Sequence, residues 1–507
     1  MKSFIVFKSN SNQYYLYSFY HNQILLINSL LAFIISLKSE NKDIGNWLNA
    51  LRMKNNSNAF NGSFSKRDAD ICYSKYLMLK ESKYFETYED PNVSGSITPN
   101  LIELQLANLR QITLEVTDKC NLKCDYCAYG KFYEDYNERT CGFLTFNSVK
   151  TLIDFLLPLW NSNKNSSKGK PIYISFYGGE PLLNIALINN VVSYIKSKVL
   201  DYNFIKFSMT TNGMLLNKHI DFLVENNFNV IISLDGDKYN NSYRRTHLGK
   251  NSYNNIINNI NLIREKYPNY FKTNINFNAV LHNRNSVEDI YLFFKNNFNK
   301  TPSIGELNNM GIKKSMIEEF KKTYQNTNAS LFNSENRDEL TKSIFINLPH
   351  IQSIGLFLNN YTNYFFKNYS NLFVDSRSIV RIPTGTCLPF GKKLFLTAQG
   401  NILPCEKIGH QFTLGKVTEV KVDLDFKSIS SYYNLIYSRI IKSCNSCYLS
   451  QSCTQCIFNL HTINDPLISC NGYTDYNDFK VYLTSHISYL EENPYVYRKI
   501  LKDITID

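Results

Sequence analysis

The sequence predicts an α/β protein: a partial (β/α)6 TIM-like barrel, with a small α+β domain before it and a cysteine-rich domain after it. Three observations lead to this prediction. Apolar, β-branched runs alternate with helical stretches between residues 106 and 310. Short polar motifs follow the ends of four of these runs. Three cysteines gather at 120–127 and seven more at 387–470, out of twelve in the chain.

Residues 1–105 form the expected N-terminal domain. Strand-like runs cover Phe4–Phe7, Tyr14–Phe19 and Ile24–Ile27, and a helical stretch follows over Ser29–Ser39. A small strand-rich unit ahead of a larger domain can bind a peptide as an additional strand. It can equally be a cap that packs on the barrel. The sequence leaves both interpretations open.

The barrel is expected over residues 106–310. Its strand-like runs are Gln111–Thr117, Ile172–Tyr177, Ile205–Thr210, Val230–Leu234, Ile275–Val280 and, as a sixth, Ser303–Leu307. Helical stretches between them cover Phe146–Leu157, Ile185–Val199, Lys218–Asn226, Tyr253–Tyr267 and Val287–Phe294. Alternation of this kind indicates parallel strands joined by crossover helices.

The polar motifs fall at the carboxyl ends of the first four strands. They are Thr117–Cys127, Gly178–Glu180, Thr210–Gly213 and Ser233–Gly236. In a β/α barrel this rim carries the active site. The sequence therefore predicts that four segments far apart in the chain meet at one site.

Three further segments complete the chain. Residues 311–380 are expected to be a helical insertion that either shapes a substrate cavity or covers the barrel. Residues 381–475 hold the second cysteine group and a predicted hairpin, Lys393–Thr397 with Gly400–Leu403. Residues 476–507 are expected to form a C-terminal helix and a short tail.

The first cysteine group has the spacing C-x3-C-x2-C, formed by Cys120, Cys124 and Cys127. Three thiolates this close in one loop can bind a single 4Fe–4S cluster and leave one iron open to a small molecule. A zinc site is the alternative, although zinc sites more often use paired C-x2-C or Cys/His sets.

Composition limits the kinds of molecule that this protein can be expected to bind and the cellular compartment in which we expect it. The net charge is +12, but no basic run with interleaved aromatic residues indicates nucleic-acid binding. The longest apolar run, Ile24–Leu37, is interrupted and too short to span a bilayer, so no membrane association is expected. Clustered cysteines are typical of metal or cluster ligation in a reducing cytoplasm, where we expect this protein.

The first motif, with Tyr126 before its last cysteine, resembles the C-x3-C-x-aromatic-C motif of the radical S-adenosylmethionine (SAM) superfamily. The downstream cysteines resemble the signature of the SPASM domain, C-x(9–15)-G-x4-C followed by C-x2-C-x5-C-x3-C and a last cysteine. The final pair here is C-x2-C instead of C-x3-C. Residues 107–117 and 127–130 look most like the ribosomal-peptide (RiPP) maturases of the Bacteroidetes type.

The resemblance implies three clusters. Cys120, Cys124 and Cys127 would hold the SAM-binding 4Fe–4S cluster. The remaining cysteines would hold two auxiliary clusters. The ligands of the outer cluster would be Cys444, Cys447, Cys453 and Cys470. Those of the inner cluster would be Cys387, Cys405 and Cys456. The stretch Arg377–Thr386 contains no further cysteine, so the inner cluster would keep an open iron for a substrate thiolate. A zinc ribbon is the alternative for Cys444–Cys456.

The rim residues would bind SAM. Gly178 and Gly179 permit close backbone approach, and Glu180 can pair with the SAM ammonium. Hydroxyl and amide contacts to ribose or carboxylate are expected from Thr211, Asn212 and Ser233. Additional assignments are Arg245, or its neighbour Arg244, on the carboxylate, Tyr126 beside the cofactor, and Val280 near adenine, whereas Asp235 is interpreted as a turn cap.

The implied activity is reductive cleavage of SAM to a 5′-deoxyadenosyl radical that modifies a ribosomally made precursor peptide. The product would be a thioether or carbon–carbon cross-link, or an epimerised residue, for which Cys141 is the nearest uncommitted hydrogen donor. An external one-electron donor such as flavodoxin or ferredoxin is implied. The alternatives are a formylglycine-forming sulfatase maturase and a non-catalytic cluster- or zinc-binding scaffold.

Overall fold

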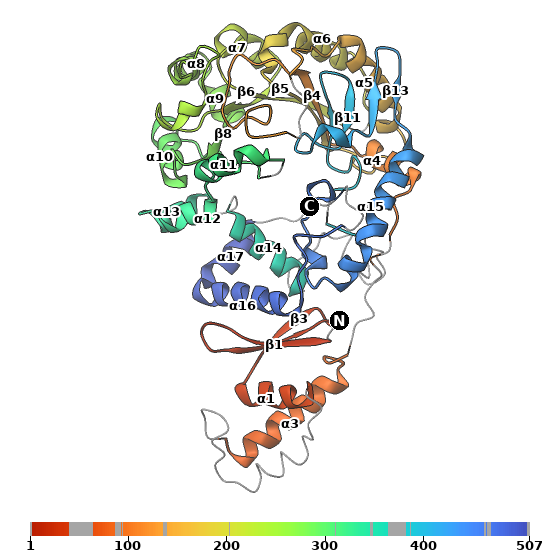
Figure 1. The fold of residues 1–507 in the computed structure, drawn as a ribbon, viewed down its shortest axis with the longest axis vertical. Helices are drawn as coiled ribbons and strands as arrows, with labels where there is room; N and C mark the ends of the chain where they lie inside the picture. The colour runs from red at the N-terminus through yellow and green to blue at the C-terminus, as the bar shows by residue number, and fades with distance from the viewer. Residues whose placement is uncertain are drawn as a thin grey trace.

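The architecture comes from a computed structural model, shown in Figure 1. The residues that it describes are 3–39, 64–86, 93, 95–134, 139–201, 203–309, 311–344, 348–362, 382–385, 387–460, 463 and 468–503. Residues 363–381, the end of the predicted insertion, and 504–507, the predicted tail, lie outside this set, as does most of the stretch Arg377–Thr386.

Six parallel strands form the centre of the barrel. They lie side by side in chain order as β4 (Gln111–Thr117), β5 (Pro171–Gly178), β6 (Phe204–Thr211), β7 (Asn229–Ser233), β8 (Ile275–Leu281) and β9 (Ser303–Glu306). Their apolar side chains are buried, for example Ile112, Leu114 and Val116 in β4. Because consecutive strands are neighbours, right-handed crossovers place every connecting helix on the same face, as in a β/α barrel.

The connecting helices form the outer layer along the top and the left side of the barrel in Figure 1. They are α5 (Phe146–Trp160), α6 (Ile185–Lys196), α7 (Leu216–Glu225), α8 (Tyr253–Lys266), α9 (Pro268–Asn274) and α10 (Val287–Phe298). The Thr145 and Ser286 side chains cap α5 and α10 by accepting backbone N–H bonds three residues ahead. The predicted alternation and the α/β class are confirmed.

The cysteine-rich segment extends the barrel sheet, which the sequence did not indicate. The strand β10 (Leu394–Leu396) pairs in parallel with β4, and the sheet continues antiparallel through β11 (Asn401–Leu403), β12 (Gly415–Val417) and β13 (Val422–Asp423). Gly400 has φ +83° in the β10–β11 turn, a conformation that favours glycine. The helix α15 (Phe426–Ser446) follows and packs on α4 (Pro99–Ala107).

The N-terminal unit is a three-stranded antiparallel sheet of β1 (Phe4–Lys8), β2 (Tyr14–Ser18) and β3 (Gln23–Ile27), with α1 (Ser29–Ser39) and α3 (Lys66–Glu81). One side of the sheet packs on these two helices. The other contacts α16 (Tyr476–Glu492), where Tyr15 hydrogen-bonds Glu491 and Asn10 N donates to Ser488 Oγ at 2.9 Å. The unit therefore rests on the C-terminal helices, far from the barrel (Figure 1).

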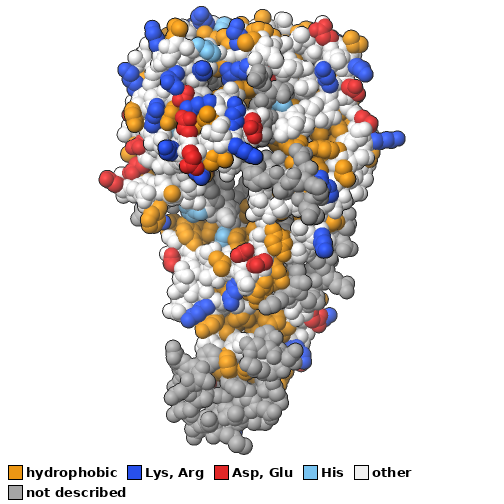
Figure 2. Space-filling model, in the orientation of Figure 1, with side chains coloured by type: hydrophobic (Ala, Val, Ile, Leu, Met, Phe, Trp, Pro, Cys, Tyr) orange, Lys and Arg blue, Asp and Glu red, His pale blue; other side chains and the backbone are white. Residues whose placement is uncertain are grey.

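Helices α11 (Ile317–Thr323), α12 (Thr327–Phe332), α13 (Arg337–Ser343) and α14 (Pro349–Tyr361) occupy the predicted insertion, and α17 (Pro494–Asp503) closes the described chain. On the face shown in Figure 2, Lys and Arg side chains are interspersed with Asp and Glu over the barrel. None of the helices in the described residues combines the length and apolarity needed to cross a bilayer.

Candidate active site

The cysteine loop leaves the carboxyl end of β4 and carries Cys120, Cys124 and Cys127, all partly buried. The three thiols lie close enough that charge on Cys120 or Cys127 raises the pKa of Cys124, although burial is the larger cause and brings it to about 12. Ligation to iron supplies the positive charge that a buried thiolate needs. The three donors therefore fit one cluster.

Two glycines bring the end of β5 against this loop. The Gly179 and Glu180 N–H groups donate to the Thr117 and Lys119 carbonyls at 2.8 and 2.9 Å. A Cβ at Gly178 would lie 2.2 Å from the Thr117 oxygen, and its φ of +137° also favours glycine. A Cβ at Gly179 would lie 2.2 Å from the Lys119 oxygen. These contacts fix the backbone directly before Cys120.

Gly179→Ala tests this packing. Both sides of the contact are backbone, so the methyl group can be accommodated only by moving the loop. We expect a loss of at least about 2 kcal/mol in the free energy of unfolding of the apo-protein, as for overpacked sites, and less iron bound per chain after reconstitution. Gly305→Ala is the matched control because nothing lies within 4 Å of its Cβ position. Equal unfolding midpoints for the two variants would contradict the expected clash.

Glu180 is fully buried where β5 meets β6. Its carboxylate accepts hydrogen bonds from Thr211 Oγ1 at 2.7 Å, Asn212 N at 2.8 Å and Leu182 N at 3.1 Å. Burial raises the pKa of Glu180 to about 7 in spite of these three bonds. A carboxylate accepts about four hydrogen bonds, so one acceptor position remains for a ligand ammonium.

Asn212 connects the third rim motif to the cysteine loop. Its Nδ2 donates to Asn121 Oδ1 at 2.7 Å and faces Cys120 Sγ at 3.7 Å. Its Oδ1 accepts from Met214 N at 3.0 Å. The side chain thus holds the loop next to the end of β6, and the first three rim motifs meet as expected.

The fourth strand brings Ser233 to the same rim, half-buried, with no side-chain hydrogen bond to the described residues. The side chain of Arg245 is 45% exposed and bound to Asp125 of the cysteine loop, with Nη2 2.5 and 2.7 Å from the two carboxylate oxygens. Arg244 is buried and bound to a different carboxylate, that of Asp235. Cys141 is exposed, on the segment after the loop.

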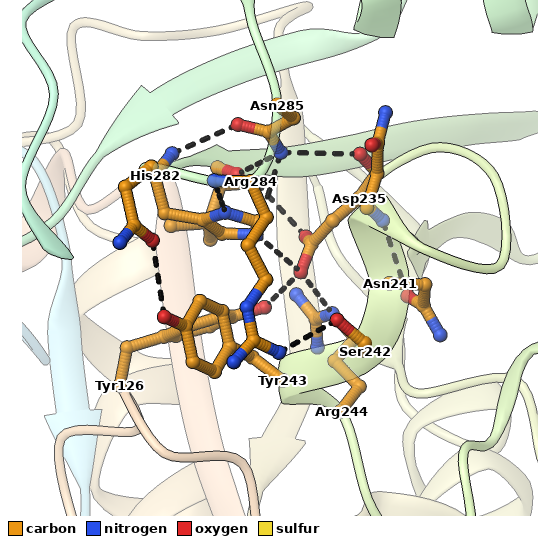
Figure 3. Close-up of polar contacts among 12 residues, drawn as sticks. Tyr126, Asp235, Asn241, Ser242, Tyr243, Arg244, His282, Arg284 and Asn285 are labelled. Atoms are coloured by element: carbon orange, nitrogen blue, oxygen red, sulfur yellow. Dashed lines mark hydrogen bonds and ion pairs between the residues drawn. The ribbon is translucent and has the colours of Figure 1, made fainter.

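A buried polar network lies beneath the cysteine loop (Figure 3). Asp235 accepts hydrogen bonds from Tyr126 Oη, from Arg244 Nε at 3.1 Å and from Val280 N at 3.0 Å. His282 Nε2 lies 3.7 Å from the same carboxylate. Burial alone would raise the pKa of Asp235, but the Arg244 charge and these hydrogen bonds lower it. Tyr126 therefore anchors the loop to β7 and β8.

This network gives Asp235 a larger role than the sequence indicated, shows the contacts of Val280 within the protein, and adds His282. Asp235 is more than a turn cap, since it is the buried counter-charge of Arg244. Val280 contributes its backbone N–H to Asp235, and its side chain packs in the apolar cluster that contains Tyr126. His282 was not singled out. Its position directly after a barrel strand, at the same rim, is the signal that would have found it.

The outer cysteine set lines one pocket. Cys444, Cys447, Cys453 and Cys470 surround it together with Thr384 and Tyr473. Burial, followed by the charges of the neighbouring thiols, raises the pKa of Cys444 to about 11. Four thiols around one enclosed space fit a cluster with four protein ligands.

The inner set lies beside α15, where Cys387 and Cys456 are next to Tyr433 and Tyr437. Burial is the main cause that raises the pKa of both Cys405 and Cys456; charge on Cys456 raises that of Cys405 further, and charge on Cys387 raises that of Cys456. Tyr433 is fully buried beside Cys456 and Cys387, and its hydroxyl has no hydrogen-bond partner among the described residues. A sulfur-rich anionic group held by these thiols would supply the missing acceptor, so the residues fit a cluster here too.

Within the described residues, no three His, Cys, Asp or Glu side chains converge at the spacing of ligands to a single metal ion. Each thiolate of a 4Fe–4S cube binds a different iron, so cube ligands stand further apart than those of one ion. The absence of such a group from the described residues therefore does not argue against cubes.

Comparison with known proteins gives the same assignment for the barrel. Residues 114–294 match the Radical SAM superfamily. The chain is 24% identical over 357 residues to the radical SAM cyclopropyl synthase TigE of Paramaledivibacter caminithermalis, covering 68% of this chain and 67% of TigE. It is 28% identical over 195 residues to the cysteine-type anaerobic sulfatase-maturating enzyme of Clostridium novyi, covering 38% of this chain and 49% of that enzyme.

Among solved structures, native anSMEcpe with bound AdoMet and Kp18Cys peptide has a TM-score of 0.51 and 18% identity, and the match covers 78% of this chain and 99% of anSMEcpe. This likeness concerns the fold. Members of the matched superfamily bind SAM on a 4Fe–4S cluster. Residues 114–294 therefore form a radical SAM domain, the catalytic domain that this superfamily of enzymes shares.

Proposed function

We propose that this chain is a radical SAM maturase that modifies a ribosomally synthesised peptide. The observation that carries the proposal is the meeting of the three-cysteine loop with Glu180 and Asn212 at one barrel rim, in a chain that also holds two further cysteine sets. A binding scaffold has no need for a cofactor pocket of this kind.

When bound, the cluster and SAM would supply a carbon-centred radical for the removal of a hydrogen atom from the substrate. The chain's own residues hold and orient the ligand. Glu180 offers its remaining lone pair to the ammonium, and Ser233 offers a free hydroxyl. Arg245 can exchange Asp125 for a ligand carboxylate, since its own side chain is 45% exposed and an ion pair that solvent reaches contributes only about 0–1 kcal/mol.

Asn212 and the Tyr126–Asp235 contact keep the cysteine loop in place during binding. The apolar side chains packed with Tyr126, such as Phe132 and Leu307, are buried and would help to keep water from a reactive radical. The outer and inner cysteine sets would hold two auxiliary clusters. The auxiliary clusters would accept an electron from the substrate after the bond has formed. An open iron of the inner cluster could also bind a substrate thiolate.

A peptide substrate is supported by the relatives. TigE is named a cyclopropyl synthase, and anSMEcpe was solved with peptides bound. The product here would be a cross-link, such as a thioether or carbon–carbon bond, or an epimerised residue. A reduced flavodoxin or ferredoxin would provide the electron.

The N-terminal unit would bind the leader part of the precursor. Its sheet has the order β1–β2–β3, so β1 and β3 are both edge strands. An extended peptide can add to such an edge through main-chain hydrogen bonds. Leu26 on β3 is 64% exposed and offers an apolar contact beside that edge.

Sulfatase maturation is the second candidate, because the anSMEcpe fold matches nearly its whole length to this chain. That match covers 78% of this chain, so the remaining part has no counterpart there. A leader-binding unit would give that additional part a role in peptide maturation.

Iron content and peptide mass test the proposal. We expect anaerobic reconstitution of the full chain to give about twelve iron per chain if three cubes form. About four iron, or one equivalent of zinc, would refute the auxiliary clusters. Co-expression with a short peptide encoded beside this gene, followed by mass spectrometry, should show loss of two hydrogens for a cross-link. If the chain instead converts a cysteine of a sulfatase peptide to formylglycine, the peptide mass falls by about 18 Da, and this result would favour the second candidate.

A further inference from the structure

Arg139 lies directly against the cysteine loop. Its Nη2 donates a hydrogen bond to Cys127 Sγ at 3.3 Å, and its guanidinium carbon is 5.1 Å from the centre of the Tyr129 ring. The residue belongs to none of the rim motifs, because it follows the loop by twelve positions in sequence and returns to it only in the fold.

The surroundings of Arg139 direct its charge at sulfur. Burial alone would lower the pKa of the guanidinium, but the Cys127 and Cys120 thiols and the Tyr129 hydroxyl raise it. Among the described residues no carboxylate lies at ion-pair distance from it, although its charge opposes the rise that burial causes in the pKa of Glu115, and its buried Nε has no hydrogen-bond partner. Tyr129, which the guanidinium covers, is itself fixed by its hydrogen bond to the buried Glu115.

Arg244 and Arg245, which also lie near the loop, are each neutralised by a carboxylate. Arg245 is bound by both oxygens of Asp125, and Arg244 by the buried Asp235. Of these three arginines, Arg139 is therefore the one whose positive charge is not cancelled by a carboxylate at contact distance. It acts on the thiol that it touches.

We propose that Arg139 is a positioning residue that hydrogen-bonds the Cys127 thiolate and makes the SAM-binding cluster easier to reduce. The proposal rests on the proposed function in taking Cys127 as a cluster ligand. Reduction adds one negative charge to the cluster. A nearby cation and an N–H···S hydrogen bond stabilise the reduced form more than the oxidised form, and partial burial limits screening by solvent.

The test is a dithionite titration of the reconstituted full chain, followed by electron paramagnetic resonance. The SAM-binding cluster is recognised as the signal that changes when SAM is added. At a fixed potential we expect Arg139→Met to lower the ratio of reduced to oxidised cluster about tenfold, equivalent to about 59 mV for a one-electron couple. Arg139→Lys, which keeps the charge but not the planar donor, should give a smaller change.

Lys131→Met is the matched control. It removes one positive charge from the same stretch of chain, but its ammonium is paired with Glu319 at 2.5 Å. Unchanged potential in Arg139→Met at full iron content would overturn the inference. If Arg139→Met binds no iron, the Arg139→Lys variant is used for the test. A reduction potential of Arg139→Lys equal to that of Lys131→Met would then overturn the inference. Absence of any SAM-responsive signal in the unsubstituted protein would instead overturn the proposed function.

Discussion

Cys124→Ala is expected to abolish reductive cleavage of SAM. Cys124 is the middle thiol of the loop in sequence, and, after burial, charge on Cys127 and on Cys120 raises its pKa, so it lies close to both. Removing it leaves two thiolates for a cube that needs three. Dithionite-reduced protein should release 5′-deoxyadenosine at a rate at least about a hundredfold lower, measured by chromatography, and bound iron should fall by about four per chain.

Cys72→Ala is the control for this substitution. It also removes one buried thiol, but from the core of the N-terminal unit, and should leave both iron content and SAM cleavage unchanged. If Cys124→Ala still cleaves SAM while Cys72→Ala binds its full iron, the three-cysteine loop is not the radical-generating site.

Asp235→Asn is expected to destabilise the apo-protein by about 3–5 kcal/mol, because it leaves Arg244 buried without its counter-charge. The side chain of Asp235 is fully buried, and that of Arg244 is 9% exposed. The amide also cannot accept from Tyr126, Arg244 and Val280 together. We therefore expect faster hydrogen exchange in residues 120–127, whose anchor is Tyr126.

Asp221→Asn provides the comparison. Asp221 pairs with Lys266 on the surface, where both side chains are about half exposed, so its loss should cost about 0–1 kcal/mol. Urea denaturation of the full chain, monitored by circular dichroism, gives both values. Equal midpoints for the two variants would show that the Asp235 network does not support the barrel.

Much of the site could be predicted from the sequence because its residues belong to short local patterns. The cysteine spacing, the two glycines and Glu180 each belong to a short segment that follows a recognisable strand. Since parallel strands carry their carboxyl ends to one rim, finding the strands was enough to predict that these segments meet. The structure places Glu180, Thr211 and Asn212 in contact, as this reasoning requires.

Contacts between segments that carry no motif could not be predicted from the sequence. The pairing of β10 with β4 joins residues nearly three hundred positions apart, and each strand alone is only an apolar run. The exposure of Arg245 and burial of Arg244 depend on which side of the chain faces β7 and β8. Two adjacent arginines look the same in sequence.

The sequence by itself determined the α/β class, the order of the barrel strands and the cysteine sets that fit clusters, because periodicity and spacing are properties of neighbouring residues. Only the tertiary structure decided which charges are paired. Asp235 became the partner of Arg244, Asp125 that of Arg245, and Arg139 was left facing Cys127. Electrostatic pairing depends on distance and burial in space, and neither is set by separation along the chain.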